Sequence, residues 1–181
     1  MSKKIAKKKF QPFVHDNLDI KNELLQLARK ARESKSIEND LASVLIYSNI
    51  AEYLAEHLLD TLSHLVYKSS YNSFGGILFV ESVSRSGKKT LNQTVEELEK
   101  FNFPDKDGIV HCFRKIADSR NRIFHNFAKS DINSIKDLLE KDLPVIQEEC
   151  EEIINKVNTV YAGLQKILGQ QENGNESQDE K

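Results

Sequence analysis

The sequence predicts an all-α protein: an antiparallel helical bundle of about four to five helices with a long second helix. Only seven glycines and three prolines occur in 181 residues, whereas sandwiches and barrels need many turns that use these residues. Apolar residues also recur at spacings of three and four over long stretches, which is the period of an amphipathic helix. At about 150 residues per domain, the length corresponds to one domain.

The two ends of the chain differ from its middle in composition. Five lysines fall within the first nine residues, so we expect residues 1–15 to be a basic, disordered arm. Residues 169–181 are mostly polar and acidic, and they carry too little apolar surface to order themselves. Between these ends, residues 16–168 form the predicted helical domain. This domain is mildly acidic, which argues against a protein that grips many nucleic-acid phosphates.

The first two helices are predicted from capping residues and apolar spacing. The first begins at Asp16 or Asn17 and ends near Ser34. Its expected apolar face consists of Leu24, Leu27, Ala28 and Ala31. After a polar break at 36–40, an apolar stripe continues for about seven turns without Gly or Pro. The stripe consists of Leu41, Val44, Leu45, Ser48, Ala51, Ala55, Leu58, Leu62 and Leu65. Packing must sustain so long a helix, which makes it the spine of the bundle.

The second half of the chain predicts a long connection and three further helices. Residues 69–89 are expected to connect the second and third helices with at most one short element. Thr90 and Gln93 form a capping box at the start of the third helix, and Pro104 follows its end. The last two helices are expected to begin near residues 105–107 and 130–131. Pro144 is expected to kink or split the fifth helix.

Several classes of function are disfavoured by composition. Cys112 and Cys150 provide neither a disulfide framework nor the paired spacing of a zinc site. The five histidines are scattered without a metal-binding motif, so we expect no metal and no cofactor. The chain lacks the run of about 18 apolar residues that a membrane span needs, and its beginning lacks the apolar run of a signal peptide. The expected location is therefore the cytoplasm, with no membrane association.

One segment interrupts the apolar pattern with polar residues. The predicted buried stripe of the fourth helix runs through Phe113 and Ile116 to Arg120, before Ile123 restores apolar character. Burying an arginine is costly unless the charge is paired, so such a residue lines an interface, a cleft or an ion pair. Arg120 also has a purely structural explanation, as the partner of an acid on another helix. His125 likewise suits the end of a helix, where a cation interacts with the last carbonyls.

The spacing in this segment sets a geometric condition. Asn121 and His125 lie four residues apart and share a helix face, whereas Arg120 and His125 are five apart. On a straight helix the latter two side chains diverge by about 140° around the axis. They converge more easily if the helix loosens near His125, or if a second chain supplies one of them.

Arg120, Asn121 and His125 resemble the Arg-x(4–6)-His signature of the HEPN superfamily, which comprises small helical bundles with a long second helix. The resemblance covers roughly residues 16–165, and its specific part is the segment from Arg120 to His125. It implies a metal-independent endoribonuclease that acts on RNA as a homodimer, with two copies of the motif facing one cleft. The implied catalytic residues are Arg120, Asn121 and His125.

The resemblance also implies supporting residues. A polar or acidic residue on the second helix is expected near the site, and Asn49 and Glu52 are both candidates. Arg122 and Lys115 are expected to add positive charge for substrate binding. Several HEPN toxins carry a tyrosine two residues after the histidine, which a partner enzyme modifies. Here that position is Phe127, so this route of regulation is not expected.

These residue types suit RNA cleavage without a metal. The 2′-hydroxyl then acts as an internal nucleophile and needs a group that moves protons near neutral pH, which is the role of His125. Arg120 would contact the phosphate oxygens as negative charge develops. Asn121 would orient the imidazole or bind a phosphate oxygen. The expected product carries a 2′,3′-cyclic phosphate.

Competing functions remain open at this point. An endoribonuclease of this kind would be a toxin or defence effector, with a protein inhibitor or antitoxin as a further partner. The alternative is a catalytically silent adaptor that uses the same fold to dimerise or to bind a protein. A nucleotide-binding regulatory domain is a third, less specific option. An adaptor has no reason to keep Arg120 and His125 together in an otherwise apolar segment.

Overall fold

The computed structural model describes residues 16–74, 89–127 and 129–175. All regular structure within these ranges is α-helical, which confirms the predicted fold class. The helices are α1 (Asp16–Glu33), α2 (Ile37–Phe74), α3 (Leu91–Leu98), α4 (Lys106–Phe127) and α5 (Ile132–Asn175). The second helix is long, as predicted, with 38 residues, although α5 is longer still, with 44.

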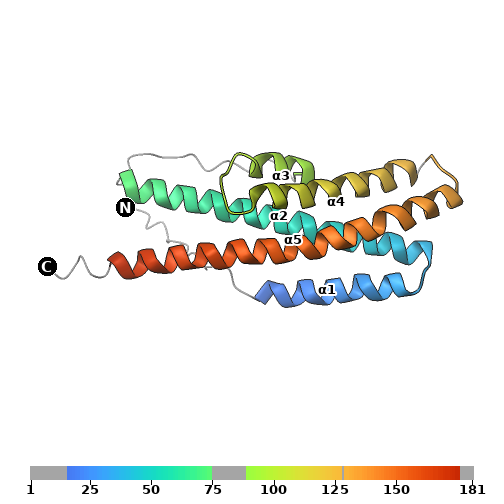
Figure 1. Ribbon diagram of the computed structural model, residues 1–181, viewed down its shortest axis with the longest axis horizontal. Coiled ribbons are helices and arrows are strands. Elements are labelled where there is room, and N and C mark those ends of the chain that lie inside the picture. Colours follow the sequence, from blue (N-terminus) through green and yellow to red (C-terminus); the bar gives the residue numbers. More distant parts are fainter. Residues whose placement is uncertain (1–15, 75–88, 128, 176–181) are drawn as a thin grey trace, which may run out of the picture.

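The helices pack as a bundle around α2, α4 and α5, which lie side by side (Figure 1). Helices that follow each other in the sequence run antiparallel: α1 against α2, and α4 against α5. As a result α2 and α5 run in the same direction, and both run opposite to α4. The short helix α3 packs on α2 and α4, while α1 lies on the opposite side of the bundle.

The core is formed mainly by large apolar side chains from the three central helices. Tyr47 and Leu54 of α2, Phe113 of α4, and Leu139 and Ile146 of α5 are all fully buried. The predicted stripe of α2 is largely confirmed, because Val44, Ala51, Ala55, Leu58 and Leu62 are buried. This shared core fixes the register of α2 on α4, and that register positions the candidate site.

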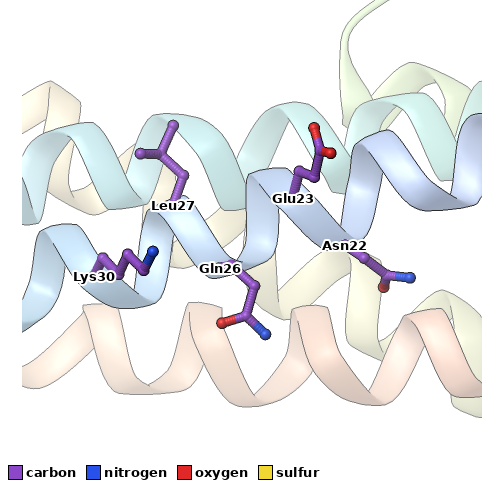
Figure 2. Close-up of a pocket in the computed structure, with 5 residues that line it drawn as sticks. All are labelled: Asn22, Glu23, Gln26, Leu27 and Lys30. Carbon is purple, nitrogen blue, oxygen red and sulfur yellow. The ribbon is translucent and has the colours of Figure 1, made fainter.

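Two leucines that the apolar pattern assigned to buried faces are exposed instead. Leu45 on α2 is 45% exposed, and Leu27 on α1 is 54% exposed. Leu25 and Ala28 make the buried face of α1, because α1 packs chiefly on α2 and buries only a narrow stripe. Leu27 borders a hollow on the outside of α1, together with Asn22, Glu23, Gln26 and Lys30 (Figure 2).

The predicted helix starts agree well with the structure. Thr90 and Gln93 form the capping box at α3: Thr90 Oγ1 accepts from the Gln93 N–H, and the Gln93 side chain accepts from the Thr90 N–H. At the start of α5, the Ser134 N–H donates to Asp131 Oδ1 at 3.0 Å. This hydrogen bond holds the pKa of Asp131 below its usual value, as is typical of a carboxylate at a helix N-terminus.

Of the two outcomes expected at Pro144, a kink or a split of the fifth helix, the split is wrong. The helix α5 continues through this residue. Proline removes its own N–H from the helical ladder and its ring crowds the carbonyl of Glu140, but the buried neighbours Leu143 and Ile146 hold both halves of the helix against the core.

Both long helices also extend further than the pattern predicted. α2 continues to Phe74, into the predicted connection, and α5 continues to Asn175, beyond the predicted domain end at 168. Extending an existing helix requires no new nucleus, so polar residues can follow a well-packed segment. The predicted arm at 1–15, most of the connection (75–88) and the last residues (176–181) lie outside the described residues. In the described parts, no helix is long and apolar enough to cross a membrane.

Both cysteine thiols are expected to resist labelling at pH 8 in the folded protein and to react fully once it is unfolded. Burial raises the pKa of Cys112 and of Cys150 to about 12. With that pKa, only about 10⁻⁴ of each thiol is the reactive thiolate at pH 8. Titration with Ellman's reagent, with and without guanidinium chloride, measures this difference. Rapid labelling of either thiol under native conditions would show that this thiol is not buried in the folded protein.

Candidate active site at the seam of α2 and α4

Arg120 is held against α2 by one carboxylate. Its Nη1 donates to Glu52 Oε1 at 2.6 Å, and the two side chains are 31% and 19% exposed. Of the two candidates on the second helix, the structure therefore places Glu52 beside the motif, whereas Asn49 is exposed and makes no hydrogen bond to Arg120. A half-buried pair of this kind agrees with the structural explanation of Arg120 and also with the acidic neighbour that the HEPN resemblance implies.

Two exposed apolar side chains lie beyond the Arg120–Glu52 pair, towards one end of the bundle. Leu45 lies two turns before Glu52, and Phe127 lies two turns after Arg120. Because α2 and α4 run antiparallel, both residues lie towards the same end of the bundle, where they are 45% and 48% exposed. Beyond the Arg120–Glu52 pair, this end of the bundle therefore carries two exposed apolar side chains.

A buried hydroxyl lies on α2, one turn from Glu52. Ser48, one turn before Glu52 on α2, is 1% exposed, and its Oγ has no hydrogen-bond partner among the described residues. The apolar stripe predicted that Ser48 is buried. The lack of a hydrogen-bond partner for its hydroxyl was not predictable, because it depends on which groups the neighbouring helices place beside it.

Asn121 and His125 lie on a different side of α4 from Arg120. The helix remains regular through Phe127, so it does not loosen near His125. Arg120 and His125 therefore leave the axis about 140° apart. His125 is exposed and Asn121 is half-buried. Within one chain, Asn121 and His125 share a face, but Arg120 and His125 do not.

The two residues predicted to bind substrate each contact a buried acid on α5. Arg122 donates from Nε and Nη2 to the two carboxylate oxygens of Asp142, at 3.1 and 2.8 Å, and the Asp142 side chain is 2% exposed. These hydrogen bonds raise the pKa of Arg122. Lys115 contacts the buried Glu149, and that hydrogen bond raises the pKa of Lys115. Both cations neutralise carboxylates of the fold, which leaves little surplus charge for a phosphate.

A cluster of potential metal ligands was missed by sequence reasoning. Ligand atoms of Cys112, Glu149 and Glu152 lie within 4.8 Å of one another. The cluster could not be seen in the sequence because α4 and α5 bring distant positions together. Its chemistry does not suit a cation: Lys115 and Lys156 already contact the two carboxylates, and burial keeps the Cys112 thiol protonated, with a pKa of about 12.

Known proteins add no further information about this chain. Comparisons with models of known protein families, with curated proteins and with solved structures find no match. The candidate site is therefore defined by its own geometry: the Arg120–Glu52 pair, His125 with Asn121, and the apolar end formed by Leu45 and Phe127.

Proposed function

We propose that the chain is a HEPN-like endoribonuclease that cleaves RNA as a homodimer, with Arg120, Asn121 and His125 as its catalytic residues. The observation that carries this proposal is that Glu52 holds Arg120 at Nη1 without occupying its other donors. Glu52 fixes the guanidinium through a single nitrogen. The other N–H groups of Arg120 make no hydrogen bond to the described residues, so they remain available to phosphate oxygens.

The divergence of Arg120 and His125 around α4 favours a site shared between two chains. A two-fold axis beside the seam would bring Arg120 of one subunit towards His125 of the partner subunit. The same arrangement would bury Leu45 and Phe127, which are otherwise large exposed apolar groups. Each subunit would then contribute the same surface, as a symmetric dimer requires.

The proposed reaction is an internal transesterification of RNA. His125 accepts the proton of the 2′-hydroxyl as its oxygen forms a bond to phosphorus, and the bond from phosphorus to the 5′-oxygen breaks. Arg120 stabilises the negative charge that develops on the phosphate oxygens. Asn121, on the same face as His125, orients the imidazole. The leaving 5′-oxygen takes up a proton from water and His125 returns its own proton to water, so the products carry a 2′,3′-cyclic phosphate and a 5′-hydroxyl end.

The purified full chain is expected to cleave RNA in the presence of EDTA. The end groups of the products test the reaction: a 2′,3′-cyclic phosphate and a 5′-hydroxyl support it. Intact RNA, or cleavage that EDTA abolishes, would argue against the proposal. Light scattering on the same sample should report a dimer, and expression should slow host growth if the chain acts as a toxin or defence effector.

A helical adaptor is the second candidate, and one specific observation favours it. Lys115, Arg120 and Arg122 each contact a carboxylate from another helix, so the surface near the motif has little unpaired positive charge. An adaptor would still dimerise through the seam or bind a protein there. A stable dimer that leaves RNA intact would support this function over cleavage.

A further inference from the structure

A separate cavity lies where α1 turns into α2, against the beginning of α5. Its volume is about 380 Å³, which is within the usual range for small-molecule sites. We call it the corner cavity. Charged side chains line two of its walls: Arg32, Lys35 and Asp40 come from the α1–α2 corner, and Lys136 and Glu140 come from α5.

The five charged side chains that line the corner cavity do not form ion pairs with one another. No ion pair within 4.0 Å joins any two of these five side chains, although all of them lie in the described part of the chain. Arg32 is held by a hydrogen bond to Gln147 of α5. Burial raises the pKa of Asp40, and the facing Glu140 adds to that effect while Arg32 opposes it. Both walls therefore present a cation and a carboxylate to a shared space.

The remaining lining is apolar. Leu139 and Leu143 are buried in the core and border the corner cavity with Ile37 and Pro144. Pro144 also lacks the N–H that would bond the Glu140 carbonyl in a regular helix. The lining thus combines an apolar base with charges of both signs.

Lys35, which lines the corner cavity, has an unusual backbone conformation. Lys35 has a φ of 50°, in the left-handed region that favours glycine at the end of a helix. A lysine here pays a conformational cost that glycine would avoid, and it places an ammonium at the corner cavity.

We infer that the corner cavity binds a small zwitterion with an apolar side chain, of the class of free α-amino acids. The ligand carboxylate would contact Lys35 and Lys136, which supply cations from both walls. Its ammonium group would contact Asp40 and Glu140. The apolar side chain would lie on the base of the cavity. A molecule with both charges satisfies both walls at once, whereas a simple anion or cation leaves one sign unmatched. This inference is independent of the proposed nuclease.

The test uses calorimetry on the full chain with L-leucine, N-acetyl-L-leucine and L-leucinamide as probes. Leucine should bind, and the two analogues, which lack the ammonium charge or the carboxylate, should bind at least about tenfold more weakly. Glu140→Gln and Lys136→Gln should each weaken leucine binding by a similar factor. The matched controls Asp137→Asn and Lys141→Gln change exposed residues of the same helix that do not line the cavity, and they should bind leucine like the original chain.

Two results would overturn the inference. One is the absence of leucine binding at millimolar concentration. The other is equal binding of leucine and its two analogues, which would indicate an apolar hollow without charge recognition. All four substitutions change exposed side chains, and thermal melting shows whether each variant is folded.

Discussion

Replacing Arg120 by alanine is expected to lower the rate of RNA cleavage by about 10³-fold. The guanidinium is the proposed cation at the phosphate, and Glu52 fixes it at one nitrogen. Arg120→Lys keeps the charge but loses the planar pair of donors, so it should retain only part of the activity. Single-turnover cleavage of a labelled RNA separates this chemical effect from substrate binding.

Arg114→Ala provides the matched control for Arg120→Ala. Arg114 also lies on α4 and also pairs with a glutamate, Glu99, but its side chain is 54% exposed. Its removal should leave cleavage unchanged. Full activity in Arg120→Ala, or an equal loss of activity in both variants, would show that Arg120 is not a catalytic residue.

Replacing Arg122 by alanine is expected to lower the free energy of unfolding by about 2–3 kcal/mol. The reason is Asp142, whose side chain is 2% exposed and would lose the guanidinium that binds both of its oxygens. Arg122 itself is 51% exposed, so solvent screens the pair and the loss falls below that of a fully buried pair. Urea denaturation measures the effect as a lower midpoint at an unchanged slope.

Replacing Asp142 as well should restore much of the lost free energy of unfolding. In Arg122→Ala with Asp142→Asn, no buried charge is left without a partner, so the double variant should be more stable than Arg122→Ala alone. Lys100→Ala is a useful comparison because the Lys100–Glu97 pair is exposed and should contribute little. If Arg122→Ala were as mild as Lys100→Ala, the pair with Asp142 would have no structural role.

The sequence predicted the elements of the fold better than the contacts between them. The capping box at Thr90 and the stripe on α2 depend on local spacing, and both agree with the structure. Leu27 and Leu45 were assigned to buried faces because the spacing of apolar residues along a helix fits more than one possible buried face. Which face is buried depends on the helix that packs against it. The continuity of α5 through Pro144 likewise depends on tertiary packing.

The partners at the site could not be predicted for a related reason. Asn49 and Glu52 are less than one turn apart, so a choice between them requires the register of α2 on α4, which is set by the core. Arg122 looked like free positive charge because Asp142 lies on another helix. The identity of the motif residues was visible in the sequence, but their ion pairs were not.

The shared site is tested most directly by mixing Arg120→Ala chains with His125→Ala chains under conditions that allow subunit exchange. Each variant alone should be inactive. Half of the dimers in an equal mixture contain one chain of each kind, and one of their two sites then has both intact residues, so about a quarter of the original activity should return. A mixture as inactive as its separate components would contradict a site in which Arg120 of one subunit acts with His125 of the partner subunit.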